Sequence, residues 1–124
     1  AREAALHGWP AMALSQYHRR GQPIDWEVAA SWAGTIFGAI DEFGPLKDGE
    51  FFNVNFPHLE HSQADEPPAI VCCEIDPSPL PVHFVKENHG WMYRGKYQDR
   101  PRRPDGDVDV CFGGQIALSR ARVV

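Results

Sequence analysis

The 124-residue sequence has no apolar run that approaches the roughly 20 residues needed to cross a bilayer, so a membrane span is excluded. A secretory signal is not expected either, because no apolar segment follows the first three residues of the sequence. Positive charge is in the minority: 12 lysines and arginines stand against 17 acidic residues, and the net charge is −5. General attraction to nucleic-acid polymers or to anionic lipid is therefore not expected.

Cysteine is scarce as well. The three cysteines, Cys72, Cys73 and Cys111, are an odd number, two are adjacent, and no CxxC spacing occurs. Neither a disulfide scaffold nor a zinc ribbon is supported, and reduced thiols of this kind predict a cytoplasmic protein. The GxSxG, GxxxxGK[ST] and GxGxxG motifs are absent too, so the sequence offers no standard nucleophile turn or phosphate loop.

Hydrophobic spacing and breaker residues predict one mixed α/β domain. The clearest element is a helix over residues 25–43, which Asp25 can cap and Gly44 ends. Phe37 is expected in its apolar face. Residues 51–56 alternate between apolar and polar side chains, as in a strand with one dry face. We further expect a helix over 1–7 and strands over 11–15, 69–75, 82–87, 91–97 and 115–124.

A cluster of aspartates resembles a calcium-binding loop, but two required residues of that loop are missing. Asp105, Asp107 and Asp109 resemble the start of an EF-hand loop, but Val110 stands where that loop needs glycine and Ile116 where it needs glutamate. We therefore expect a solvated acidic turn, within a charged loop over 99–107.

A cationic segment follows the predicted hairpin. Residues 94–103 carry five lysines and arginines, and Tyr93 and Tyr97 are interleaved with them. Such a mixture could hold phosphates or stack a base. Neighbouring aspartates partly neutralise the segment, so a solvated loop or a contact between subunits is the favoured interpretation.

Histidine and cysteine leave two weaker alternatives. His58 and His61 are three residues apart with Glu60 between them, which allows a zinc site but favours a plain polar loop. Cys111 stays a candidate nucleophile, although no sequence neighbour stands out that would lower its pKa.

Three segments, in order along the chain, resemble the C-terminal part of the SurE survival-protein family. Residues 8–15 (GWPAMALS) are similar to the family's G-x-P-A-[IL]-A-x-S, and residues 52–57 (FNVNFP) to its L-N-[VI]-N-[VF]-P strand. Residues 107–119 resemble its T-D-x-x-A…G-Y-[VI]-S-[IV]-T-P-L ending, except that Gln115 replaces the tyrosine and Arg120-Ala121 the Pro-Leu pair.

The resemblance implies an α/β fold: the C-terminal part of a three-layer, Rossmann-like sheet with a β-hairpin extension. Residues 1–124 would form a single, incomplete SurE-like domain, with the sheet and flanking helix in 1–75 and the hairpin extension and closing strand in 76–124. Residues 1–7 would continue a helix that begins before Ala1. In the family the hairpin commonly reaches across to another subunit, so a homo-oligomer is expected.

The resemblance also implies an activity, that of a metal-dependent phosphatase acting on nucleoside 5′- or 3′-monophosphates. The family holds a divalent metal (Mg or Mn) with an Asp pair, a Ser and an Asn, and binds phosphate near an S-G-T run at a helix N-terminus. None of these has a matching position here, so catalytic residues and metal ligands are expected outside this chain. By itself the chain should be inactive.

Three residues are expected near the substrate of the intact protein: Ser15, Asn53 and Asn55. Ser15 ends a predicted strand, at the carboxyl edge where open α/β sheets bind ligands. Its alternative role is to cap a turn at Gln16. The asparagines could bind a ligand, but fixing the path of an adjacent loop is the favoured role. The competing hypothesis for the whole chain is a non-catalytic oligomerisation or interaction module.

Overall fold

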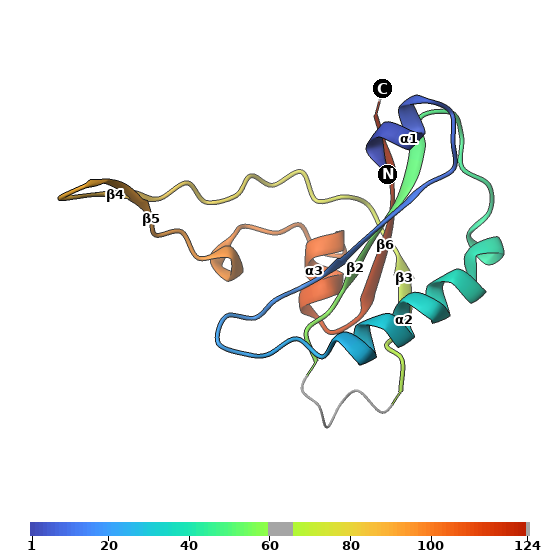
Figure 1. Cartoon of the computed structure of the whole chain (residues 1–124), viewed down its shortest axis with the longest axis horizontal. Coiled ribbons are helices and arrows are strands. Elements are labelled where there is room, and N and C mark those ends of the chain that lie inside the picture. The colour runs from blue at the N-terminus through green and yellow to red at the C-terminus, as the bar shows by residue number, and fades with distance from the viewer. Residues whose placement is uncertain (60–65, 124) are drawn as a thin grey trace.

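The computed structural model of the chain describes residues 1–59 and 66–123. A four-stranded sheet forms the body, in the order β1-β2-β6-β3, and a two-stranded hairpin of β4 and β5 stands away from it (Figure 1). β1 runs parallel to β2, β2 is antiparallel to β6, and β3 is parallel to β6. The strands are β1 (Met12–Gln16), β2 (Glu50–Phe56), β3 (Ile70–Cys72), β4 (Phe84–Glu87), β5 (Gly90–Tyr93) and β6 (Ile116–Arg122).

Helix α2 (Trp26–Gly38) covers one face of the sheet. As predicted, Asp25 caps it: the carboxylate accepts hydrogen bonds from the N–H groups of Glu27 and Val28, both at 3.1 Å. The predicted alternation of β2 is confirmed, because Phe52, Val54 and Phe56 are buried on the face that this helix covers. The main core comprises Trp32, Ile36, Phe52, Val54, Phe56, Ile116 and Leu118.

Two details of this helix differ from the sequence-based prediction. The α-helix ends at Gly38, and the chain continues as a 3₁₀ turn, η1 (Ile40–Phe43). Phe37 is 58% exposed, so its placement in the apolar face was wrong. The buried stripe is narrower and runs through Ala29, Trp32 and Ile36, at spacings of three and four.

Helix α3 (Asp107–Phe112) covers the opposite face and was not predicted. Val110 and Cys111 pack against Ala117 of β6, so the sheet lies between two helices (Figure 1). The expectation of a solvated acidic turn was wrong for Asp107, which is buried because it opens this helix. The sequence does contain two signals for this helix: Asp107 and Asp109 in its first turn, and two glycines directly after Phe112.

The predicted hairpin is confirmed, and it forms an arm that projects from the body (Figure 1). Every residue of β4 and β5 is exposed. Few side chains hold the arm together: the Tyr93 hydroxyl donates to the Pro81 carbonyl at 2.8 Å, and Arg94 pairs with Glu87. The short helices α1 (Arg2–Leu6) and η3 (Tyr97–Asp99) complete the described chain, in which no helix is long and apolar enough to span a membrane.

Candidate functional site

The carboxyl ends of the parallel strands β1 and β2 meet at one edge of the sheet. Ser15 and Asn55 are register partners there, and the Ser15 hydroxyl donates a hydrogen bond to Asn55 Oδ1 at 2.6 Å. The pair therefore lies where open α/β sheets bind ligands. Its hydrogen bond ties two strands together, and among the described residues it takes the place of a cap by Ser15 at Gln16 and of a bond from Asn55 Oδ1 to a loop.

Asn53 lies apart from that pair. It points to the same face as Asn55 but sits two residues deeper in β2, opposite the buried Ser119 of β6. Ser15 and Asn55 line a common hollow, and Asn53 is not among its lining residues. The structure thus brings two of the three predicted residues together, and their contact with substrate stays a prediction.

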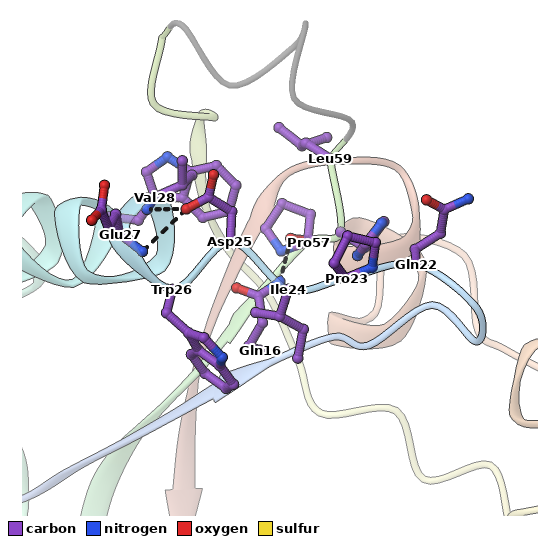
Figure 2. A pocket seen from close by; sticks show the side chains of 12 residues that line it. Gln16, Gln22, Pro23, Ile24, Asp25, Trp26, Glu27, Val28, Pro57 and Leu59 are labelled. Atoms are coloured by element: carbon purple, nitrogen blue, oxygen red, sulfur yellow. Dashed lines mark hydrogen bonds between the residues drawn. The ribbon is translucent and has the colours of Figure 1, made fainter.

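A hollow of about 830 Å³ opens beside this edge on the α2 face (Figure 2). Its floor includes Gln16, whose side-chain amide donates to the carbonyl oxygens of Pro57, at 2.8 Å, and Tyr17, at 3.2 Å. The Oε1 atom of Gln16 is buried without a hydrogen-bond partner in the described residues. The wall is made by Trp26, Trp32 and the first turn of α2.

A second hollow, of about 440 Å³, opens on the α3 face, and we call it the α3-side hollow. Ser15 and Asn55 lie in it. Beside them, three aromatic rings come together from distant parts of the sequence: the Tyr17 ring stacks on Phe112 with centroids 4.6 Å apart, and Tyr97 meets Phe112 edge-on at 5.7 Å. The other polar groups that line it include Asp76, Arg100 and Asp107.

Two buried aspartates hold the loops behind that hollow. Asp107 Oδ1 accepts from the N–H of Asp76 at 2.8 Å, and the Asp76 carboxylate accepts from the N–H groups of Ser78, at 2.8 Å, and Arg103, at 2.7 Å. Hydrogen bonds from the side chain and backbone of Ser78, and then from Arg103, lower the pKa of Asp76 to about 2. Asp76 therefore stays charged and ties the two ends of the arm to each other.

Cys111 does not suit a nucleophile. The thiol is buried at 5% exposure, and burial, with Asp107 and Cys73 adding to it, raises the pKa of Cys111 to about 12. The Sγ atom lies 3.5 Å from the Phe56 carbonyl oxygen, within α3's packing against β2. The thiolate that nucleophilic attack requires is therefore strongly disfavoured.

Two arginines of the cationic segment, residues 94–103, make contacts with other parts of the chain. Arg100 donates to the Ser78 carbonyl at 2.6 Å and lies 5.6 Å from the Tyr97 ring centre. Arg102 pairs with Asp109 at 3.1 Å, and its guanidinium lies over Phe112. Arg100 thus belongs to the body rather than to a solvated loop, which sequence reasoning missed because its partners are distant along the chain.

The described residues do not form a metal centre. Among them, no three His, Cys, Asp or Glu side chains are grouped as a metal ion would require. His58 lines the hollow on the α2 face, whereas Glu60 and His61 lie outside the described residues.

A sheet with helices on both faces and a ligand edge at the ends of parallel strands defines a Rossmann-like α/β protein. The structure superimposes on the SurE protein of Aquifex aeolicus with a TM-score of 0.63, at 15% identity, over 100% of this chain and 50% of that one. That likeness shows the fold.

Sequence comparison then gives the family. The family model of "Survival protein SurE" matches residues 1–75, and the chain belongs to the SurE family. It is 40% identical over 122 residues to the "Putative 5'-nucleotidase alr3139" of Synechocystis sp., across 98% of this chain and 53% of that protein. It is also 32% identical over 138 residues to the 5'-nucleotidase SurE of Cereibacter sphaeroides. The chain spans about half the length of these curated relatives.

Proposed function

We propose that this chain supplies one half of a phosphatase that hydrolyses nucleoside 5′- or 3′-monophosphates. The observation that carries the proposal is the 40% identity over 122 residues to a protein whose printed name is a 5'-nucleotidase. The Ser15–Asn55 pair at the carboxyl edge of β1 and β2 supports it, because a hydroxyl and an amide there can hydrogen-bond a substrate. A divalent ion, Mg or Mn, would polarise the phosphoryl group, with its ligands outside this chain.

The proposal is tested on the intact protein that carries this sequence, after its mass has been determined. Phosphate release is measured from nucleoside 5′- and 3′-monophosphates with magnesium or manganese. Release that depends on either ion is the expected result. A protein of full mass that releases no phosphate with either ion is not a phosphatase of this kind.

The role of Ser15 has its own test in that assay. Ser15→Ala should lower kcat/KM by about 10-fold or more if the hydroxyl bonds a charged substrate group. Ser31→Ala is the matched control, because Ser31 is exposed on α2, on the other face of the sheet. Equal rates in both variants would leave Ser15 with the strand-linking role alone.

A non-catalytic interaction module is the second candidate, and the exposed arm favours it. Val82 is 80% exposed and Trp91 70%, although both side chains are strongly apolar. We propose that a second copy of the protein covers the arm, as a homo-oligomer in the cytoplasm. Light scattering of the intact protein and of a Trp91→Glu variant tests this: the variant should shift toward the monomer, and an unchanged mass would exclude the arm as the contact.

A further inference from the structure

The α3-side hollow contains chemistry that phosphate hydrolysis alone does not require. Its aromatic members form one cluster and come from the residue after β1, from η3 and from α3: Tyr17, Tyr97 and Phe112. Tyr97 is 42% exposed, so much of its ring is open to a ligand. Flat aromatic surfaces of this kind stack nucleobases.

The guanidinium of Arg100 lies next to that cluster, and not all of its N–H donors make strong hydrogen bonds. Its NH2 group donates to Ser78, and its NH1 group makes a long contact of 3.4 Å with the Tyr97 hydroxyl. Nε is buried and has no hydrogen-bond partner within the described residues. A base carbonyl, a ring nitrogen or a ribose oxygen could satisfy donors of this side chain after a small rearrangement.

The charges that line the hollow favour the uncharged base and ribose of a nucleotide over its phosphate. Asp76 and Asp107 place two carboxylates on its lining, against the single guanidinium of Arg100. A phosphate dianion directly beside these two carboxylates would be repelled, whereas an uncharged heteroaromatic base with its ribose would not. The volume of about 440 Å³ lies within the range of small-molecule sites.

The hollow also adjoins the proposed reaction edge. Ser15 and Asn55 line it together with the aromatic cluster. A nucleoside bound against Tyr97 would extend toward the carboxyl ends of β1 and β2, where the phosphoryl group is expected.

We propose that the α3-side hollow binds the base and ribose of the substrate, with Tyr97 as the stacking surface and Arg100 as the hydrogen-bond donor. The inference rests on the proposed function, and it adds the part of the protein that selects a nucleotide over other phosphate esters. Tyr97 is then the residue that determines specificity in this hollow.

The first test is direct binding of adenosine, which has no phosphate, to the isotope-labelled intact protein. Amide and ring signals of Tyr17, Tyr97 and Phe112 should shift on titration by NMR. Tyr97→Leu should weaken adenosine binding by about 10-fold, and Tyr97→Phe, which keeps the ring, should bind as the wild type does. Shifts confined to the hollow on the α2 face, or no shifts at all, would overturn the proposal.

Kinetics provide the second readout. For Tyr97→Leu, KM for adenosine 5′-monophosphate should rise by about 10-fold, while p-nitrophenyl phosphate, which has no base, is hydrolysed as before. Phe37→Leu is the control, since Phe37 is exposed on the opposite face. Equal losses with both substrates would mean a structural role for Tyr97.

These readouts separate the two proposals. Adenosine binding without phosphate release would reject the phosphatase and keep the nucleoside site. Phosphate release without adenosine binding in the hollow would do the reverse.

Discussion

The sheet body and the projecting arm differ in where they place their apolar side chains. In the body, Ile36, Val54 and Ile116 are completely buried. In the arm, Trp91 is 70% exposed and Phe84 52%, although these side chains are just as apolar. The body buries its own apolar side chains, whereas those of the arm are exposed and are the ones that the proposed contact with a second copy would cover.

The two regions also differ in how much free energy stabilises them. Fully burying an aliphatic side chain stabilises a fold by roughly 1.5–3 kcal/mol, and the body contains many such residues. A two-stranded hairpin without a packed face is marginally stable at best in water. The arm therefore depends on its attachment at Asp76 and on any partner that packs against it.

The largest expected effect is in the body. Ile36→Ala should reduce the free energy of unfolding by about 2–5 kcal/mol, because it leaves a cavity between α2 and the sheet where Ile36 is 0% exposed. Chemical denaturation of the intact protein measures this loss. A loss below about 1 kcal/mol would mean that α2 is not a fixed layer of the fold.

The second prediction concerns the junction of the two regions. Asp76→Asn replaces one of the two accepting carboxylate oxygens by an NH2 group that only donates, so the bond from Ser78 or the bond from Arg103 is lost. The backbone amides of those two residues should exchange hydrogen markedly faster, while amides of β2 keep their protection. Unchanged exchange at Ser78 and Arg103 would show that the arm is held by other contacts.

The pH dependence of that junction follows from the same bonds. The folded-state pKa of Asp76, about 2, lies below its ordinary value of 3.8. Its stabilising contribution is therefore complete above about pH 4 and is lost as the pH falls toward 2. A carboxyl NMR titration of Asp76 should show a midpoint near 2, and a midpoint near 3.8 would contradict the assigned hydrogen bonds.

A smaller, stabilising effect is expected in α2. Gly34 lies inside the helix and is exposed, and an added Cβ would meet nothing within 4 Å. Gly34→Ala should therefore stabilise the body by about 0.5–1 kcal/mol through helix propensity. Thermal melting compares it with the wild type, and a destabilised variant would show that this face of α2 is covered in the intact protein.

The smallest effect completes the comparison. In dilute solution Trp91→Ala should change the free energy of unfolding by less than about 0.5 kcal/mol, because the indole packs against little. The measurement is repeated at high protein concentration. A loss of unfolding free energy that appears only at high protein concentration would show that a second copy covers the arm. A large loss at every concentration would mean that the arm folds onto the body.

Local signals explain which elements could be predicted from sequence. Asp25 and the alternation of β2 carry information within a few residues, so α2 and the central strand were predicted. Helix α3 has only six residues, and it is stabilised by Val110 and Cys111 packing on Ala117, which neighbours in sequence do not reveal. Short helices of this kind depend on tertiary contacts.

The candidate site shows the same division. Ser15 and Asn55 were predicted because each sits in a recognisable strand. Tyr17 and Tyr97 are far apart in sequence and meet only after the arm has left the body and returned. Their common position could not be predicted without the fold.

The place of β6 in the sheet has a consequence for synthesis. It is the last of the described strands, yet it lies between β2 and β3 and pairs with both. A ribosome therefore leaves the edge of β2 that pairs with β6 open for about sixty further residues before residues 116–122 emerge. Non-local pairing of this kind slows folding and leaves strand edges open to aggregation. A nascent chain paused before Ile116 should be a preferred substrate for chaperones that bind apolar strands.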